Sequence, residues 1–309
     1  MTCKVRAMPG GHEFTVKAGE SVLDAALRQG VTLPYGCRNG TCGSCKGQIT
    51  AGRVEYGDTP PVALSEPERA RGMALFCLAR PLGDLTIAAQ ATVAGDLPVK
   101  KLPARVVKKE FLAPDVVRLY LKLPTAVRLQ FLAGQYIDFL LPDGRHRSFS
   151  LANAPHDDEF IELHLRHVEQ GEFTEYVFYH MKEKSMVRIE GPHGDFYLRE
   201  ASARPMIFVA GGTGFAPIKG IIEHAFAAGV GRAMHLYWGA RAKVDLYLEA
   251  LPRQWLQEYA NFRYTPVLSV PAESDRWQGP TGYVHETLAA DYPDLRGYDV
   301  YAAGPPAMV

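Results

Sequence analysis

The chain has 309 residues, of which 47% are hydrophobic and 22% are charged, a balance typical of a globular protein with two or three domains. Lysine plus arginine equals aspartate plus glutamate at 34 each, so no net charge attracts the chain to nucleic acid or to an anionic membrane. The sequence holds no run of about eighteen apolar residues, and its first residues, MTCKVRAMPGGHEF, lack the apolar core of a signal peptide. The expected location is therefore the cytoplasm, where thiols stay reduced.

Residues 1–92 are expected to form a small β-rich domain with one short helix. The segments CKVRAM and FTVK alternate apolar and polar residues on either side of a Pro-Gly-Gly turn at 9–11, which predicts a β-hairpin. Ser21 and Asp24 form the capping-box pattern at the start of the helix VLDAALRQ, and Gly30 ends it. The glycines and small polar residues of PYGCRNGTCGSCKG then predict a loop.

Four of the five cysteines follow the spacing of a plant-type 2Fe-2S cluster. Cys37, Cys42 and Cys45 have the pattern C-x4-C-x2-C, and Cys77 follows Cys45 after 31 intervening residues. In a reducing compartment such a group of thiols is more typical of metal ligands than of disulfide bonds. We therefore expect these four thiolates to hold the two irons of a cluster.

The residues around the cysteines agree with this expectation. Gly36, Gly40 and Gly43 allow backbone N–H groups to turn towards the sulfides of a cluster and to stabilise its reduced state. The alternative is a structural zinc site, but zinc sites usually pair two short Cys-x2-Cys elements, and this sequence has one. Cys3 stands apart at the start of the first strand, and no role is expected for it.

The middle of the chain is expected to form an antiparallel β-barrel over residues 100–201. The segment ATVAGDLPVKKLP, residues 91–103, has the composition of a linker and marks a domain boundary. One helix, EFTEYVFYHM, interrupts a series of short runs rich in valine, isoleucine, leucine and aromatic residues. These predicted strands are ARVVKKEFL, VVRLYLKL, YIDFLL, FIELHLRHV and SMVRIEG.

Residues 203–309 are expected to form a doubly wound parallel sheet. PMIFVAGG, FAPIKGIIEHAFAAG and MHLYWGA alternate as strand, helix and strand, which predicts a βαβ unit, and NFRYTPVLS and YDVYAAG supply further strands. Sheets of this type bind their ligands at the carboxyl ends of the strands.

The segment Arg147-Ser148-Phe149-Ser150 ends a predicted strand and resembles the R-x-[YF]-[ST] signature of the ferredoxin-NADP reductase family. This resemblance implies that Arg147 pairs with a flavin phosphate and that the ring of Phe149 lies against the isoalloxazine. It also implies that the hydroxyl of Ser150 reaches flavin N5, where the hydride arrives, and Ser150 is therefore the expected catalytic residue. A fork of donors for an anion and a flat apolar partner for a planar ring suit this chemistry.

Further segments agree with a flavin site. Gly171 and Thr174, in Gly-Glu-Phe-Thr at the start of the predicted helix, are expected to bind a pyrophosphate, which favours FAD over FMN. Gly191 and Gly194, in GPHGDFYL, resemble the G-P-x-G-x-F loop of the same family, and Arg166 is expected to be a second charge partner. Each segment alone is more often an ordinary strand or turn, and it is their order and spacing that favour a flavin.

The glycine-rich turn Gly211-Gly212-Thr213-Gly214 follows the strand MIFVA and precedes a helix that begins near Ala216-Pro217. It resembles the nicotinamide-binding turn of the same family. In such a turn, glycine lets the backbone approach the phosphates of a dinucleotide.

The end of the sequence, AAGPPAMV, resembles the C-G-P-P-x-M motif of the same family, which implies that Gly304 and Pro305 lie beside the nicotinamide. Ala303 stands where a cysteine is common, and that cysteine assists hydride transfer in some relatives, so the change is expected to affect the rate more than the reaction. The family usually continues with a helix and a last strand that carries aromatic residues near the flavin. A truncated nicotinamide domain with slower or uncoupled turnover is therefore expected.

The choice between NADH and NADPH depends on the residues after the second strand of this domain. Arg241 favours the 2′-phosphate of NADPH, whereas Asp245 disfavours it. The alternative is that these two residues form only a solvated charge pair. Most reductases with this domain order use NADH, and NADH is the expected nucleotide.

The resemblance extends over the whole chain. The order of a ferredoxin, a flavin barrel and a nicotinamide domain, with the fragments LPYGCRNGTCGSCKG, ALSEPER and LFCLARP, resembles the reductase components of bacterial oxygenases and the CDP-6-deoxy-3,4-glucoseen reductases that serve a sugar dehydrase. The family implies transfer of a hydride from NAD(P)H to FAD, then of single electrons to the cluster and on to a partner protein.

Two other functions stay open at this point. One is a stand-alone flavin or quinone reductase, and the other is a ferredoxin-like carrier that senses redox state or nucleotide. The identity of a partner protein depends on the surface around the cysteine loop, where Arg38, Asn39 and Lys46 are the expected exposed residues.

Overall fold

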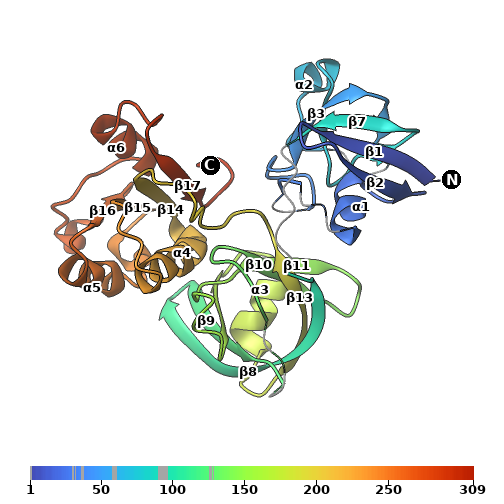
Figure 1. Cartoon of the computed structure of the whole chain (residues 1–309). Helices are drawn as coiled ribbons and strands as arrows, with labels where there is room; N and C mark the ends of the chain where they lie inside the picture. The colour runs from blue at the N-terminus through green and yellow to red at the C-terminus, as the bar shows by residue number, and fades with distance from the viewer. Residues whose placement is uncertain are drawn as a thin grey trace. The chain divides into compact units, whose positions relative to one another are not determined.

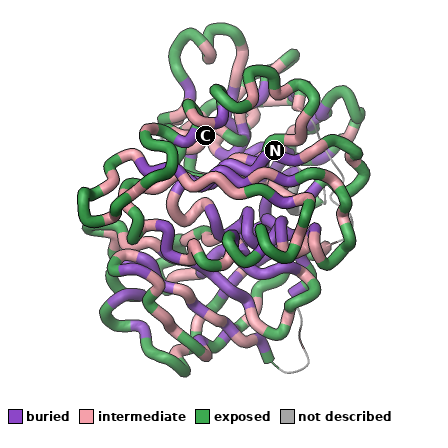
Figure 2. Tube along the Cα trace, turned by 90° about the vertical axis from the view of Figure 1, so that its left-hand side faces the viewer, coloured by how far each residue is buried: buried purple, intermediate pink, exposed green. Residues whose placement is uncertain are grey.

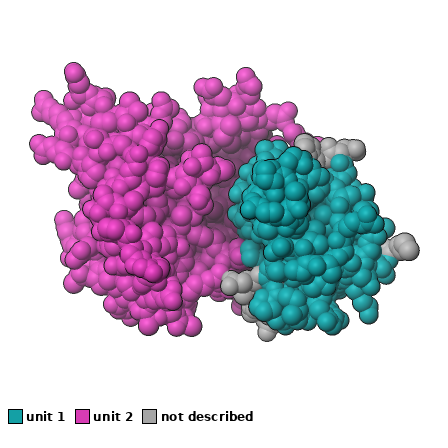
Figure 3. Space-filling model, turned by 90° about the horizontal axis from the view of Figure 1, so that it is seen from above, with its two compact units in different colours: residues 1–98 teal, residues 99–309 magenta. Residues whose placement is uncertain are grey.

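The computed structural model describes residues 2–29, 31, 33–35, 38–57, 61–89, 97–124, 127 and 129–309. The chain divides into two compact units, Met1–Pro98 and Val99–Val309, which Figure 3 colours separately. The expected flavin and nicotinamide domains, 100–201 and 203–309, both lie in the second unit, and the boundary between them stays a prediction. Gly30, predicted to end the first helix, and Gly36 and Cys37, predicted to belong to the cluster loop, lie outside the described residues.

The first unit begins with the predicted hairpin. Strand β1 (Thr2–Met8) pairs with β2 (His12–Lys17) in antiparallel register, with Val5 opposite Phe14. Alternate residues of both strands are buried, as a strand with one face on a core requires. Helix α1 (Val22–Arg28) follows, and its start is the predicted capping box, since the Asp24 backbone N–H donates to Ser21 Oγ.

Three more strands complete a five-stranded mixed sheet in the order β2-β1-β7-β3-β5. They are β3 (Lys46–Ala51), β5 (Met73–Leu75) and β7 (Leu85–Ala88), and β7 runs parallel to β1. The short strands β4 (Val54–Glu55) and β6 (Arg80–Pro81) pair separately.

The prediction of one short helix in this unit is wrong, because a second helix, α2 (Glu66–Ala70), is present. It begins with a capping box in which the Ser65 backbone N–H donates to the Glu68 carboxylate. A helix of five residues is too short to show a periodic apolar face, so the capping residues are its only signal in the sequence.

The second unit begins with a six-stranded antiparallel sheet in the order β11-β10-β13-β8-β9-β12 (Figure 1). An isolated bridge between Leu151 and Leu163 joins the chain after β11 to β12 at the opposite edge. All the predicted strands of this region are present. The strands are β8 (Lys100–Ala113), β9 (Val116–Lys122), β10 (Tyr136–Leu140), β11 (His146–Ser150), β12 (Ile161–Arg166) and β13 (Met186–His193).

The expected linker at 91–103 needs a correction. Strand β8 already begins at Lys100, which pairs with Gly191 of β13, so the last residues of that segment belong to the sheet. Backbone pairing with a distant strand determines this boundary, and the composition of the segment does not reveal it.

The predicted helix of this region has two parts. A single α-helical turn, α3 (Glu172–Glu175), continues as a π-helical turn, η1 (Tyr176–His180). Figure 1 shows α3 surrounded by the strands of the antiparallel sheet. Phe173, Val177 and Phe178 are buried there among the residues of the sheet, and the ring of Phe173 lies 4.9 Å from that of Phe139.

The rest of the unit is a four-stranded parallel sheet in the order β16-β15-β14-β17. Its strands are β14 (Met206–Gly211), β15 (Met234–Ala240), β16 (Phe262–Leu268) and β17 (Asp299–Ala303). Its helices are α4 (Phe215–Ala227), α5 (Ala250–Glu258) and α6 (Val284–Asp291).

Both faces of this sheet are covered. Phe208 packs into a core that holds α4 and α5 residues, whereas its neighbours Ile207 and Val209 pack with α6. Figure 1 shows α6 on the opposite side of the sheet from α4 and α5, and Figure 2 shows buried residues running along the strands. Within the described part of the chain, no helix is long and apolar enough to cross a membrane.

Candidate functional site

A cavity of about 860 Å³ lies in the second unit, where the antiparallel and parallel sheets meet. It is formed by the ends of β11 and β12, the start of α3, the turn after β14 and the residues after β17. These elements bring together all the cofactor residues predicted from the sequence except Gly191 and Gly194. The predicted residues in its lining are Arg147, Phe149, Ser150, Arg166, Gly171, Thr174, Gly211, Gly212, Thr213, Gly214, Gly304 and Pro305.

The end of strand β11 carries the predicted flavin residues Arg147, Phe149 and Ser150, and all three line the cavity. The hydroxyl of Ser148 donates to the buried carboxylate of Asp138 over 2.6 Å on the neighbouring strand. The ring of Phe149 lies beside that of Phe173, with their centroids 5.7 Å apart, and both rings reach the cavity. The hydroxyl of Ser150 has no hydrogen-bond partner among the described residues, so it is available to a bound molecule.

Arg166 is one of the cationic residues that line the cavity. Its Nε and Nη2 atoms are buried and have no hydrogen-bond partner in the described part of the chain, although Nε lies 3.4 Å from the carboxylate of Asp115. The guanidinium also reaches the nicotinamide turn, because a Cβ added to Gly212 would lie 3.5 Å from Arg166 Cζ. Buried donors are nearly always satisfied in native proteins, so these atoms indicate an acceptor such as a phosphate oxygen.

Thr174 lines the cavity, and its hydroxyl is hydrogen-bonded within the loop before α3. It accepts a hydrogen bond from the Val168 backbone N–H over 3.1 Å, and it donates to the carbonyl oxygen of Gly171 over 2.9 Å. The side chain therefore stabilises this loop. Contact between this hydroxyl and a pyrophosphate stays a prediction.

The glycine-rich turn and the AAGPP segment, predicted separately, pack backbone against backbone. A Cβ added to Gly214 would lie 2.0 Å from the carbonyl oxygen of Ala303, and one added to Gly304 would lie 3.0 Å from Gly211 Cα. No other residue type fits at such distances, which gives a packing reason for these glycines. The turn is also held by Trp238, whose Nε1–H donates to the carbonyl oxygen of Gly212 over 3.0 Å.

Gly191 and Gly194 lie outside the lining of this cavity. A Cβ on Gly191 would lie 2.7 Å from the side chain of Ile137, and Gly194 has a φ of +95°. The carbonyl oxygen of Gly194 accepts a hydrogen bond from the side chain of Gln135 over 2.9 Å. Packing and backbone conformation therefore account for both glycines, and their contact with a flavin stays a prediction.

The cysteine loop of the first unit brings two predicted ligands together. The Sγ atoms of Cys45 and Cys77 lie 3.1 Å apart, and both residues are buried. Cys42 is half-buried, with its Sγ 3.4 Å from the hydroxyl of Ser44, and Cys37 lies outside the described residues. Among the described residues no three histidine, cysteine, aspartate or glutamate side chains converge as a metal site, so the set of four ligands stays a prediction.

Two glycines shape this loop as the sequence predicts. Gly40 and Gly43 have φ angles of +81° and +76°, in the left-handed region that glycine adopts without strain. A Cβ on Gly40 would also lie 2.4 Å from the side chain of Leu78, the residue after Cys77.

The expected exposed residues of the loop need a correction. Arg38 is paired with Asp24 at 2.9 Å and Lys46 with Glu68 at 2.6 Å, and the side chains of both basic residues are only about a quarter exposed. The hydrogen bond from Lys46 lowers the pKa of Glu68 to about 2. Ion pairs with distant residues therefore hold these two cations, and Asn39 alone is exposed as expected.

A second cavity, of about 800 Å³, adjoins the first and shares Arg145, Glu172 and Phe173 with it. Its walls also include Tyr176 of η1, which is 43% exposed, and several apolar residues of the antiparallel sheet. Sequence reasoning missed this cavity because its residues come from strands and turns that are far apart in the chain.

The residues after β15 include Arg241 and Asp245, on which the choice of nucleotide depends. Asp245 accepts a hydrogen bond from the Ala242 backbone N–H over 3.1 Å, so its carboxylate caps the short helix η3 (Lys243–Asp245). Arg241 is exposed. The Asp245 carboxylate is engaged within its own short helix, and the part of Arg241 in the choice between NADH and NADPH stays a prediction.

The fold and the cavities define a class of protein: a two-sheet nucleotide-type oxidoreductase unit whose antiparallel and parallel sheets meet at one cavity, together with a separate unit that carries a cysteine loop. Three family models agree with this class. They are the 2Fe-2S iron-sulfur cluster binding domain at residues 5–82, the oxidoreductase FAD-binding domain at 103–197 and the oxidoreductase NAD-binding domain at 208–309. These matches confirm the predicted cofactors.

Known proteins resemble the chain over its whole length. It is 37% identical to the CDP-6-deoxy-L-threo-D-glycero-4-hexulose-3-dehydrase reductase of Yersinia pestis, covering 100% of this chain and 92% of that protein. It is 38% identical to the phenol hydroxylase P5 protein of Acinetobacter pittii, covering 100% and 88%. The crystal structure of the Amycolatopsis cytochrome P450 reductase GcoB superposes with a TM-score of 0.81 at 36% identity, covering 99% of this chain and 92% of that one.

The chain belongs to this family of iron-sulfur flavoprotein reductases, which act as the reductase components of oxygenases and of a deoxysugar dehydrase. The ferredoxin-NADP reductase type of fold, with an added ferredoxin domain, is thereby confirmed. The predicted activity, an NAD(P)H-dependent flavoprotein reductase that transfers electrons, is confirmed as well.

Proposed function

We propose that the 860 Å³ cavity binds FAD and NADH together and that the chain passes the electrons through a 2Fe-2S cluster to a partner protein. One observation carries this proposal. The end of the flavin strand at Ser150 and the nicotinamide turn at Gly211–Gly214 line the same cavity, although about sixty residues separate them in the sequence.

The residues of the cavity suit both nucleotides. The two buried nitrogens of Arg166 need an acceptor, and Arg147 adds a second cation for the flavin phosphates. Phe149 and Phe173 supply an apolar wall for a planar ring, and the hydroxyl of Ser150 is the group proposed to contact flavin N5. FAD, when bound, accepts a hydride from NADH and releases its electrons singly.

The adjoining 800 Å³ cavity supports FAD over FMN, because it extends the flavin site past Arg145 and Glu172. We propose that the adenosine half of FAD lies there, against the half-exposed ring of Tyr176.

Cys37, Cys42, Cys45 and Cys77 are the proposed ligands of the cluster. Thiolates are the protein ligands of 2Fe-2S clusters, and the close approach of Cys45 and Cys77 supports this set. The relatives named above serve an oxygenase or a dehydrase, so the proposed electron acceptor is a protein component of one of these two kinds. The proposed location is the cytoplasm, where such thiolates persist.

The finer architecture is also a proposal. We assign the mixed sheet of the first unit to a β-grasp, the antiparallel sheet to a flavin-binding barrel and the parallel sheet to a doubly wound fold. Closure of the barrel is supported by the bridge between Leu151 and Leu163, and the doubly wound assignment by helices on both faces.

The test is a visible spectrum of the anaerobically purified protein before and after addition of NADH, and separately of NADPH. We expect flavin and iron-sulfur bands that bleach with NADH at lower concentration than with NADPH, and FAD as the flavin released on denaturation. Bands that are present but respond to neither nucleotide would contradict the proposal, and faster bleaching by NADPH would overturn the choice of NADH. The exposed Arg241, with Asp245 turned to its own helix, is the feature that NADPH would use.

A further inference from the structure

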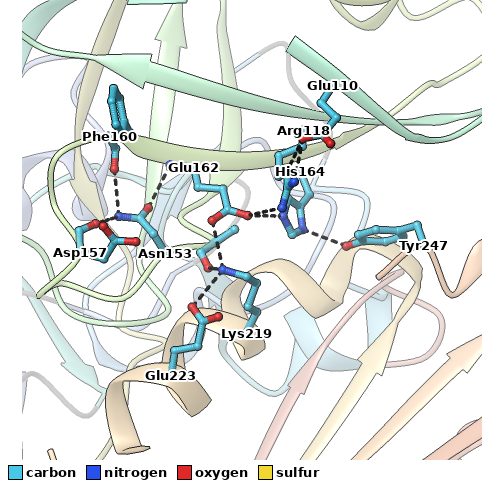
Figure 4. Close-up of polar contacts among 11 residues, drawn as sticks. Glu110, Arg118, Asn153, Asp157, Phe160, Glu162, His164, Lys219, Glu223 and Tyr247 are labelled. Atoms are coloured by element: carbon cyan, nitrogen blue, oxygen red, sulfur yellow. Dashed lines mark hydrogen bonds and ion pairs between the residues drawn. The ribbon is translucent and has the colours of Figure 1, made fainter. Parts of the chain in front are cut away.

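A buried network of charged side chains joins the antiparallel sheet to the parallel one (Figure 4). Glu162 of β12 accepts hydrogen bonds from His164 Nε2 over 2.9 Å and from Lys219 Nζ over 3.0 Å. The side chains of these three residues are at most 8% exposed. Lys219 belongs to α4, and it also donates to Glu223 over 2.9 Å. No part of this network was predicted from the sequence.

Hydrogen-bond chemistry determines the direction of each contact. Burial raises the pKa of Glu162, but the hydrogen bond from His164 and the charge of Lys219 outweigh it and lower that pKa to about 2. The carboxylate is therefore an acceptor only, and His164 Nε2 carries the proton. Burial lowers the pKa of His164, which favours the neutral ring. With the proton on Nε2, Nδ1 of the neutral ring accepts a hydrogen bond from the hydroxyl of Tyr247, 3.0 Å away.

One end of this network is attached to the flavin strand. Lys219 Nζ donates to the carbonyl oxygen of Ala152, two residues after Ser150, over 3.1 Å. Helix α4 also approaches this segment closely, because a Cβ added to Gly220 would lie 2.8 Å from the carbonyl oxygen of Asn153. His164 itself lines the 860 Å³ cavity, two residues before Arg166.

The other end is attached to the nicotinamide turn. The ring of Tyr247 packs edge-on against Trp238, with centroids 5.2 Å apart, and Trp238 stacks on Phe215 at 4.0 Å. Phe215 is the first residue of α4, directly after the glycine-rich turn. Trp238 donates to the carbonyl oxygen of Gly212 in that turn. Both surfaces of the cavity are therefore connected to the network through buried contacts.

We propose that Glu162, His164, Lys219 and Tyr247 form a positioning network that sets the distance and angle between the flavin strand and the nicotinamide turn, and thereby the rate of hydride transfer. This inference rests on the proposed function. A displacement of about 1 Å at reacting atoms can reduce a rate about a hundredfold, so a rigid connection between the two surfaces matters for the chemistry.

The buried ion pairs and hydrogen bonds of this network are better suited to fix the positions of the elements than to stabilise the fold. Buried ion pairs often contribute little net stability compared with apolar residues of similar volume, because removing the charges from water offsets their attraction. Their hydrogen bonds are directional, however, and a satisfied network holds one arrangement of the elements it joins.

The test compares two buried tyrosines in the holoenzyme, Tyr237 on β15 and Tyr247 in the turn before α5. Tyr247→Phe removes the hydroxyl that donates to His164, whereas Tyr237→Phe removes a hydroxyl that donates to Asp291 over 2.6 Å on the α6 side of the sheet. Anaerobic stopped-flow absorbance gives the rate constant of flavin reduction at saturating NADH, and the absorbance of the NADH–flavin charge-transfer complex reports how the two rings lie. Titration with NAD⁺ gives nucleotide affinity.

We expect Tyr247→Phe to lower the rate constant about 10- to 100-fold and to weaken the charge-transfer absorbance. The Kd for NAD⁺ should change by less than about threefold, and Tyr237→Phe should resemble the unmodified protein. An equal fall in both variants, or a change confined to Kd, would overturn the inference. Bleaching by NADH in the unmodified protein tests the proposed function separately: if that protein bleaches and Tyr247→Phe bleaches equally fast, only the positioning network is refuted.

A second variant tests the same connection without Tyr247→Phe. Trp238→Phe removes the donor to Gly212 and interrupts the connection at its other end, and we expect it to lower the rate of flavin reduction in the same way. Where both single variants fold, we expect the double variant to show less than the product of the two effects, since both changes act through one connection. Independent, multiplying effects would contradict a shared network.

Discussion

Arg166 is a residue predicted from the sequence whose guanidinium, in the described part of the chain, has unpartnered buried nitrogens in the cavity. Its guanidinium lies between strand β12 and the nicotinamide turn, and two of its nitrogens are buried without a hydrogen-bond partner among the described residues. Its carboxylate neighbour Asp115 is 41% exposed and lies 3.4 Å from Nε, so solvent weakens this pair. The Arg166 guanidinium is therefore suited to bind an anionic ligand, whereas its ion pair with Asp115 contributes little to the stability of the fold.

Substitution of Arg166 with alanine is therefore expected to weaken FAD binding by about 10- to 100-fold, since hydrogen bonds to charged groups contribute about 1.5–3 kcal/mol each. The measurement is fluorescence titration of the apoprotein with FAD. Arg296→Ala is the matched control, because Arg296 is 90% exposed, is paired with the neighbouring Asp294 and lies outside the lining of the cavity. Unchanged affinity in Arg166→Ala would remove this residue from the flavin site.

Strand β15 carries a half-buried histidine, His235, that makes stability depend on pH. The two ring nitrogens of His235 lie 2.9 Å from the hydroxyls of Tyr292 and Thr265. Burial lowers the pKa of His235 from 6.5 to about 4. The folded protein therefore resists a proton that the unfolded chain accepts below pH of about 6.5.

The unfolding free energy is consequently expected to be constant above pH of about 6.5 with respect to this group and to fall as the pH is lowered towards about 4. His235→Gln should show a shallower fall over the same range. Urea unfolding at several pH values, followed by tryptophan fluorescence, measures this, because Trp238, Trp255 and Trp277 all lie in the second unit. Identical slopes for the variant and the unmodified protein would contradict the role of His235.

At the scale of the whole molecule, the two compact units divide the chemistry. The second unit holds the 860 Å³ cavity that is proposed to bind both nucleotides, and the first holds the cysteine loop. Under the proposed function, reduction of the flavin by NADH needs only the second unit, whereas transfer to a protein acceptor needs the cluster as well. The two activities are therefore expected to separate on mutation.

Cys77→Ser is expected to remove the iron-sulfur absorbance and to reduce electron transfer to cytochrome c at least about tenfold, while bleaching of the flavin by NADH continues. Cys3→Ser is the matched control, since Cys3 lies on β1 with its Sγ 4.0 Å from the carbonyl oxygen of Pro81 and is not a predicted ligand. Spectra and cytochrome c reduction of both variants make the comparison. Retained cluster absorbance in Cys77→Ser would remove this cysteine from the ligand set.

Much of the fold was predictable, and the errors have physical causes. The predicted strands of the antiparallel and parallel sheets are present because each has a period-two pattern or a continuous apolar run that few other structures can bury. The start of β8 at Lys100 and the helix α2 were missed, since strand pairing and a five-residue helix have weak local signals. Arg38 and Lys46 were expected to be exposed, and partners distant in the sequence hold them instead.

Short patterns in the sequence were enough to predict the three cofactors: a Cys-x4-Cys-x2-Cys spacing, a strand that ends in Arg-Ser-Phe-Ser and a glycine-rich turn. The contacts that hold these parts together became visible in the folded structure. The network around Glu162 and the second cavity both depend on contacts between residues that are distant in the sequence. A local motif depends on residues that are neighbours in the sequence, whereas burial and hydrogen-bond partners depend on how the sheets pack together.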